Sequence, residues 1–231
     1  MHLLWLIPIL PFAGFLLLTL LSGWHRSQRL TAVIGVGSVG VAAALSGLVA
    51  VSFITAPPPD GAYVYNYWTW FHVGDFAPQI GLYLDALSLL FVLVITVVGF
   101  LIHLYSADFM ADENNWNYAR FFSYLNLFVS MMLVLVLADN FLLLYLGWEG
   151  VALCSFLLIG FWYQDPKNGR AARKAFIVTR IGDTALAIAL FLLFDNLGTL
   201  DIQPAMRLAA AQWPLGSALA LWTAVMLFGG A

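Results

Sequence analysis

Charged side chains are scarce in this sequence. Its 231 residues include nine Lys and Arg and twelve Asp and Glu, which together make up 9% of the chain. Soluble globular chains carry roughly 25% charged residues, so this shortage excludes a water-soluble domain. The net charge of −3 also provides no basic surface for phosphate groups, which argues against nucleic acid as a partner.

Cysteine and cofactor motifs are almost absent. The single Cys154 lies in an apolar run and excludes an internal disulfide, and no CxxC pair or His/Cys cluster provides haem or iron–sulfur spacing. The G-x-G-x-x-G match at 35–40 lies inside another apolar run and not in a strand-to-helix turn, so we interpret it as close helix packing. We therefore expect no metal, nucleotide or redox cofactor on this chain.

Long apolar runs are what the sequence has in abundance. Hydrophobic residues make up 63% of the chain, and about 20 consecutive ones cross the ~30 Å hydrocarbon layer of a membrane. Six complete runs and an unfinished seventh are present, at 3–21, 30–55, 82–105, 121–138, 141–163, 175–194 and 215–231. The predicted fold class is an all-α polytopic membrane protein with six complete transmembrane helices and a truncated seventh.

The basic residues predict how these spans are oriented. If the loops alternate between two sides, one side holds only Arg207, and the other holds Arg26, Arg29, Arg120, Lys167, Arg170, Arg173 and Lys174. Basic loops stay on the cytoplasmic side. The N-terminus is therefore expected outside, and the loops at 24–29, 108–120 and 164–174 are expected inside.

The outside loop at 56–81 carries an aromatic strand pattern. It opens with a Pro/Gly turn signal at 57–61 and then alternates aromatic with smaller residues over 63–71. Such alternation is strand periodicity, and Trp and Tyr favour membrane interfaces. The pattern predicts a short aromatic β-hairpin on the outside face, and a short surface helix is expected in the second outside loop, 195–214.

Three ionisable residues lie at membrane depth: Glu149 in the fifth predicted span, and Arg180 with Asp183 in the sixth. Each costs about 2.5–3.5 kcal/mol at a helix centre. The helical rise places Glu149 and Asp183 about 6 Å apart along the membrane normal, with Arg180 about 10 Å from Glu149 and able to pair with Asp183 at i, i+3. We interpret them as a proton or cation relay. The alternative is a buried ion pair that only fixes helix packing.

Polar side chains also recur at helical spacing on the third and fourth spans. Thr96, His103 and Ser130 are the candidates for a relay or a polar lining, within stripes that include Ser88, Gly99, Ser123 and Asn126. Interhelical hydrogen bonds are the alternative for the hydroxyl and amide groups. For His103, near the inside end of its span, a structural histidine and a proton relay are both open.

Several stretches resemble a known family. They are FLIHLYSADFM at 100–110, ARFFSYLNLFVSMMLVLVLADN at 119–140, LYLGWEGVALCSFLLIGFWYQDPKNG at 144–169, KAFIVTRIGDTALAIALF at 174–191 and WTAVMLFGGA at 222–231. These stretches resemble the L-subunit family of bacterial NADH-quinone oxidoreductase, which is respiratory complex I. The first 80 residues match that family in layout more than in letters.

The resemblance implies an antiporter-like subunit in the membrane arm that couples electron transfer from NADH to quinone to proton translocation in the bacterial inner membrane. It assigns Glu149 of the G-W-E-G motif and the Arg180–Asp183 segment to an intramembrane ion-pair relay. NADH, FMN, iron–sulfur clusters and quinone would be bound by partner subunits. The implied partners are other membrane-arm subunits, especially a neighbouring antiporter-like subunit, together with the lipid bilayer.

The resemblance also implies two parts, an N-terminal region at 1–110 and the start of the proton-conducting domain at 128–231. In the family a lysine that pairs with the glutamate follows about one turn beyond G-G-A, so we expect a partial chain. Three alternatives remain open: the large subunit of a multisubunit Na⁺/H⁺ antiporter, the related membrane subunit of a hydrogenase, and a structural membrane fragment without transport.

Overall fold

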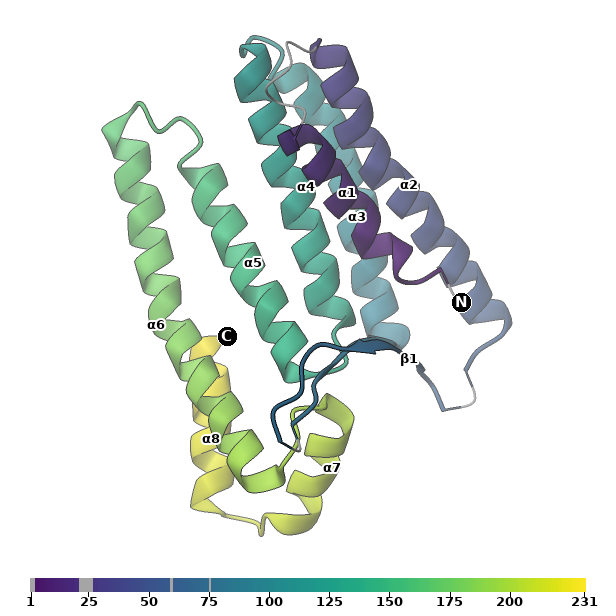
Figure 1. The fold of residues 1–231 in the computed structure, drawn as a ribbon, viewed down its shortest axis with the longest axis vertical. Coiled ribbons are helices and arrows are strands. Elements are labelled where there is room, and N and C mark those ends of the chain that lie inside the picture. Colours follow the sequence, from purple (N-terminus) through teal and green to yellow (C-terminus); the bar gives the residue numbers. More distant parts are fainter. Residues whose placement is uncertain (1–2, 21–26, 59, 75) are drawn as a thin grey trace.

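The computed structural model describes residues 3–20, 27–58, 60–74 and 76–231. The described chain is mostly helical, with one two-stranded sheet (Figure 1). Its elements are α1 (Leu6–Leu20), α2 (Gln28–Thr55), β1 (Tyr63–Thr69), β2 (Gln79–Leu84), α3 (Ala86–Phe109), α4 (Asn115–Leu137), α5 (Phe141–Ile159), α6 (Pro166–Leu197), α7 (Ile202–Gln212) and α8 (Ala218–Gly230).

Five of the described helices, α2 to α6, are long and apolar enough to cross a membrane. The prediction of six complete spans is not confirmed, because α1 has only 15 residues. At 1.5 Å per residue it rises about 22 Å, less than the ~30 Å of the hydrocarbon layer. Residue 21 of the predicted first span lies outside the described residues. The unfinished seventh run forms the 13-residue α8.

Helix α6 begins earlier than the apolar pattern predicts. The loop expected at 164–174 is helical from Pro166, because Asp165 caps the helix by accepting a hydrogen bond from the backbone N–H of Lys167 at 2.8 Å. Proline is favoured in the first turn of a helix, where its missing N–H is not needed. The basic residues of this segment therefore lie on the first turns of a 32-residue helix.

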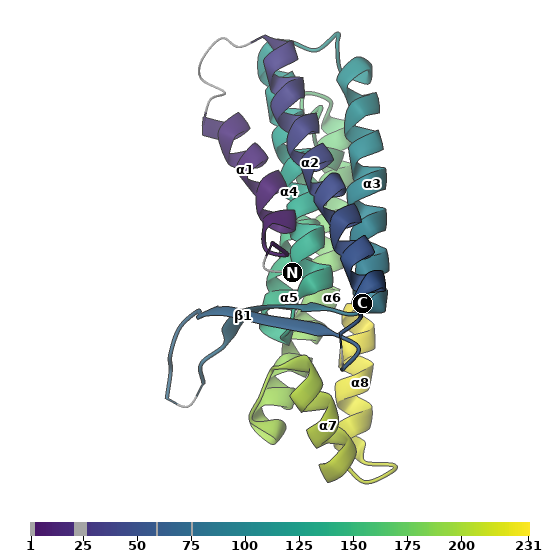
Figure 2. The ribbon, with the colours of Figure 1, turned by 90° about the vertical axis from the view of Figure 1, so that its right-hand side faces the viewer.

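The helices pack as a row in which α4 is central. It packs against α1, α2, α3 and α5, whereas α6 packs on α5 and α8. Figures 1 and 2 show the β-hairpin crossing one end of the row, with α7 beyond it. The largest core cluster joins α3, α4 and β2 through fully buried side chains that include Leu84, Val92, Leu133 and Leu137.

The predicted aromatic hairpin is present. Strands β1 and β2 pair antiparallel, with an irregularity between Asn66 and Trp68. The rings of Tyr63, Tyr65 and Tyr67 are partly buried on one face and stack in sequence at centroid distances of 6.4 and 6.5 Å. A two-stranded ribbon is marginal in isolation, so its packing against the helix ends explains why it forms.

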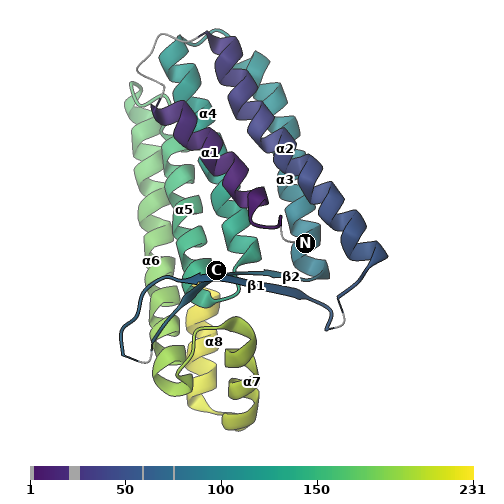
Figure 3. The ribbon, with the colours of Figure 1, turned by 45° about the vertical axis from the view of Figure 1, so that its right-hand side comes forward.

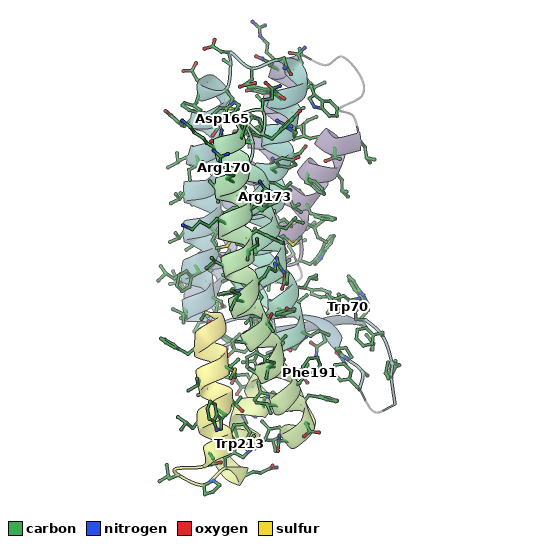
Figure 4. The ribbon with its side chains drawn as sticks, turned by 90° about the vertical axis from the view of Figure 1, so that its left-hand side faces the viewer. Trp70, Asp165, Arg170, Arg173, Phe191 and Trp213 are labelled. Atoms are coloured by element: carbon green, nitrogen blue, oxygen red, sulfur yellow. The ribbon has the colours of Figure 1, made fainter. Side chains whose placement is uncertain are left out.

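The predicted inside and outside loops gather at opposite ends of the bundle. At the hairpin end, Leu82 bridges to Ala138, and Asn140 bridges to Asp201 beside the predicted short helix, which is α7. At the other end, the side chain of Gln28 donates to the backbone oxygen of Glu113 at 2.6 Å. Arg26 and the other residues of the 21–26 segment lie outside the described residues. Figures 3 and 4 show the two ends from other sides.

We expect the hairpin end to face outside. Figure 4 shows Arg170 and Arg173 toward one end of α6, and Trp70 and Trp213 toward the other. In Asp60→Cys and Gln164→Cys variants, an impermeant maleimide should label the first from outside and the second only from the cytoplasmic face, because basic segments stay inside. The native Cys154 is fully buried and should not react. Labelling of Gln164→Cys from outside would reverse the orientation.

A carboxyl group at the hairpin end should make local stability depend on pH. The backbone of Asp139 accepts from Ile202 at 3.1 Å and donates to Gly81 at 3.3 Å. Burial and then the neighbouring Asp201 raise the pKa of Asp139, and burial raises the pKa of Asp201.

The pKa of Asp139 is higher in the folded protein than in the unfolded chain, so the protonated carboxyl favours the folded contact with Ile202. This stabilisation is complete below the ordinary pKa of aspartate and is lost as the pH rises through the raised pKa. Hydrogen-exchange protection of the Ile202 amide should therefore fall as the pH rises above about 4, the ordinary pKa of an aspartate. Asp139→Asn should flatten most of this dependence. Equal pH profiles for the variant and the wild type would contradict the assignment.

Candidate intramembrane ion-pair site

The interface between α5 and α6 holds the three ionisable residues found at membrane depth. Glu149 lies near the middle of α5, and Arg180 and Asp183 lie near the middle of α6. Both helices are long and apolar enough to cross a membrane, and they pack side by side. The structure therefore brings together the three residues that the sequence singled out for a relay.

Arg180 is shared between two carboxylates. Its Nη1 forms an ion pair with Oε2 of Glu149, and its Nε lies 3.5 Å from Oδ2 of Asp183. The second contact lacks hydrogen-bond geometry, since both atoms are buried without a hydrogen-bond partner. The guanidinium also lies 4.4 Å from the ring centroid of Phe176, where the ring face attracts a cation. Arg180 is thus paired with Glu149 and lies within ion-pair distance of Asp183.

The structure adds a direct contact between Glu149 and Arg180 that the sequence did not predict. The rise of the helices predicted about 10 Å between Glu149 and Arg180 along the membrane normal, whereas the two form a direct ion pair. The long arginine side chain can cover that axial distance. The i, i+3 contact between Arg180 and Asp183 is confirmed.

Trp148 is a partner of the site that the sequence reasoning missed. Its indole Nε1 donates a hydrogen bond to Oδ1 of Asp183 at 2.8 Å, and the Asp183 side chain is only 3% exposed. Adjacent residues of α5, Trp148 and Glu149, therefore both contact α6. The position of Trp148 directly before Glu149 in G-W-E-G was the available signal, but pairing across helices cannot be derived from spacing within one helix.

The charges of the site do not balance when both acids are ionised. One guanidinium faces two carboxylates, which leaves a net charge of −1, and a single added proton makes the group neutral. Charge is costly inside a membrane unless it is paired. This arrangement can therefore take up and release one proton by shifting a single arginine between two partners.

The other candidate residues belong to a different part of the bundle. Thr96 donates to the carbonyl of Val92 at 2.7 Å and lies 2.7 Å from the hydroxyl of Ser46. Ser130 of α4 donates to the carbonyl of Pro8 of α1 at 2.9 Å. Hydroxyl side chains commonly hydrogen-bond across helices in membrane proteins. Both hydroxyls therefore tie helices together.

His103 differs from these hydroxyls because one of its ring nitrogens is free among the described residues. Its Nδ1 lies 2.7 Å from the carbonyl of Gly99, whereas Nε2 is buried without a hydrogen-bond partner. Helix α3 packs on α2, α4 and β2, so His103 lies across the row from the α5–α6 site. The structure does not bring His103 together with Glu149.

Comparison with known proteins places this geometry in a family. A profile described as NADH-Ubiquinone oxidoreductase (complex I), chain 5 N-terminus matches residues 70–122, and one described as NADH:quinone oxidoreductase/Mrp antiporter, TM matches residues 138–231. NADH-quinone oxidoreductase subunit L of Escherichia coli is 51% identical over the whole chain, and that of Pseudomonas aeruginosa is 49% identical. The chain belongs to the NADH-quinone oxidoreductase subunit L family.

The chain spans 37% of the length of these two subunit L relatives. A solved structure of the Mrp complex from Dietzia has the same fold over 97% of this chain and 23% of its own, with a TM-score of 0.73 at 24% identity. An archaeal membrane-bound sulfane sulfur reductase has a TM-score of 0.73 at 19% identity, over 97% of this chain and 33% of its own. The bundle is thus common to membrane subunits of several complexes. Among the described residues, no group of three or more His, Cys, Asp or Glu could hold a metal ion.

Proposed function

We propose that this chain is part of a membrane-arm subunit that translocates protons in NADH:quinone oxidoreductase. The observation that carries the proposal is the position of Arg180 between Glu149 and Asp183 at the α5–α6 interface. Intramembrane ionisable groups that pair across helices are typical of ion pathways. The relatives at 49–51% identity support the complex to which the subunit belongs.

The relay works by exchange of arginine partners. When a proton reaches Glu149, the carboxylate loses its charge and its hold on Arg180. The guanidinium then moves toward Asp183, with which it already shares a 3.5 Å contact. When the proton leaves, Glu149 draws Arg180 back. Trp148 keeps a hydrogen bond to Asp183 in the present state and so stabilises that carboxylate while the arginine is bound to Glu149.

The redox chemistry belongs to partner subunits in this proposal. NADH, FMN, iron–sulfur clusters and quinone are bound there, and this subunit lies in the bacterial inner membrane beside another antiporter-like subunit. We further propose that His103, Thr96 and Ser130 line a second polar path through α3 and α4, in which the buried Nε2 of His103 exchanges a proton through water. The division into regions 1–110 and 128–231 is part of the same proposal.

A second candidate function is cation exchange in a multisubunit Na⁺/H⁺ antiporter. The fold shared with the Dietzia Mrp complex favours it, but the identity to the subunit L relatives is twice as high. A structural fragment without transport is the third interpretation. These functions differ in the proteins that should bind to this chain.

We expect flavin and iron–sulfur centres to copurify with this chain. An affinity tag on the complete subunit, used in mild detergent from the native host, should recover NADH oxidation together with the absorbance of both cofactors, because the membrane arm holds the redox subunits. An unrelated tagged membrane protein of the same host serves as the control. Recovery of membrane subunits alone would favour the antiporter and contradict the proposed complex.

A further inference from the structure

A cavity of about 590 Å³ lies between α1, the hairpin, α4 and α5. Its lining includes Ile9, Leu82, Leu143 and Leu146, together with two hydroxyl residues. As far as the structure describes the chain, no charged side chain lines it. Ligand pockets typically measure roughly 300–1,000 Å³ and are mostly apolar, so the cavity has the size and chemistry for a small apolar ligand.

Aromatic side chains line the part of this cavity beside the hairpin. Trp5, Tyr67 and Trp68 line it beside the hairpin, and Trp and Tyr gather where headgroups meet the hydrocarbon layer. From there the cavity extends between membrane helices. A ligand that fits has an apolar chain that points into the layer and a polar group near the hairpin.

One hydroxyl in the cavity is available for that polar group. The Tyr67 oxygen is buried and faces the backbone of Trp5 without reaching hydrogen-bond geometry. The other hydroxyl, on Ser130, already donates to Pro8. A buried hydrogen-bond donor without a partner costs about 1–3 kcal/mol. An acceptor on the ligand would therefore give the Tyr67 hydroxyl its missing hydrogen bond.

We propose that this cavity binds one acyl chain of a membrane glycerolipid, with the ester carbonyl accepting a hydrogen bond from Tyr67. A helix is a poorer occupant, because a cylinder about 10–12 Å across and 5.4 Å high fills roughly 400–600 Å³ with a single turn. A hydrocarbon chain is narrow enough to extend along the whole cavity. Because the lining is uncharged, we expect the cavity to recognise the acyl chain and the ester group of the lipid. The charge of the lipid headgroup should not affect binding.

The test uses the complete complex in nanodiscs that contain a phosphatidylcholine with a diazirine on its acyl chain. After illumination, mass spectrometry locates the labelled residues. Leu82 and Leu143 are 5% and 4% exposed, so bulk lipid around the protein cannot reach them, and their labelling reports the cavity. Val39 is fully buried away from the cavity and gives the background. We expect labelling of both leucines well above Val39.

Two variants separate the cavity from the general lipid surface. Leu146→Trp fills the cavity from its 42% exposed rim and should reduce labelling of Leu82 and Leu143 to background. Leu90→Trp makes the same change on a 57% exposed position of α3 and should leave labelling unchanged. Labelling of the two leucines at the level of Val39 in the wild type, or unchanged labelling in Leu146→Trp, would overturn the proposal.

The hydroxyl is tested separately. Tyr67→Phe should weaken retention of the labelled ester lipid by about two- to tenfold, as expected for one hydrogen bond. A matched ether lipid should show the same loss in the wild type and no further loss in Tyr67→Phe. Equal retention of ester and ether lipids by the wild type would overturn the assignment of the ester carbonyl to Tyr67.

Discussion

Glu149→Gln should reduce proton pumping by the complete complex to less than about a tenth, because loss of a proton-transferring side chain typically costs a hundredfold or more in its step. The amide keeps the size of the side chain and can still accept a hydrogen bond, but it cannot ionise. Assembly should therefore persist. Proton uptake is measured with a pH-sensitive dye in sealed vesicles, and NADH oxidation should fall with it where the two remain coupled.

The chain provides a matched control for this change. Glu113 is its other glutamate, and it lies in the loop before α4, where Trp162 and Asn117 donate hydrogen bonds to its carboxylate at 2.7 Å. These bonds lower the pKa of Glu113, so it stays ionised and does not cycle. Glu113→Gln should leave pumping near normal. If Glu149→Gln assembled normally and pumped at the wild-type rate, the carboxylate would have a structural role alone.

The helix positions were largely predictable, whereas the helix ends were not. Apolar runs indicate where lipid surrounds the chain, so α2 to α5 lie close to their predicted ranges. The start of α6 at Pro166 depends on a local cap by Asp165, in a stretch whose polarity resembles a loop. The ion pair between Arg180 and Glu149 joins α5 to α6, and the position of a helix end does not reveal such a contact.

Contacts within one helix were also easier to predict than contacts between helices. The i, i+3 spacing of Arg180 and Asp183 follows from helical geometry alone. The hydrogen bond from Trp148 to Asp183 and that from Ser130 to Pro8 each join separate helices. Their formation depends on the rotation of one helix against another, which a single sequence does not determine. The aromatic hairpin was predictable because its alternation is local.

Arg180→Gln should destabilise the subunit by about 3 kcal/mol, at the lower end of what breaking a buried ion pair costs. The lower end applies because the side chains of Arg180 and Glu149 are 33% and 23% exposed. Without the guanidinium, two carboxylates remain at membrane depth with Trp148 as the donor to one of them. The midpoint of thermal unfolding in detergent and the amount of assembled complex both measure this loss. Arg170→Gln, on the exposed first turns of α6, should change stability by no more than about 0.5 kcal/mol.

Neutralising Glu149 and Asp183 as well should restore the stability that Arg180→Gln removes. In the triple variant that adds Glu149→Gln and Asp183→Asn, no buried charge lacks a partner, and the amide groups can hydrogen-bond with one another. Buried ion pairs replaced by neutral groups are often as stable as the original. We expect assembly to return while pumping stays absent, because the site can no longer take up a proton. A triple variant as unstable as Arg180→Gln would show that Arg180 stabilises α6 through its contact with the Phe176 ring and not through the two carboxylates.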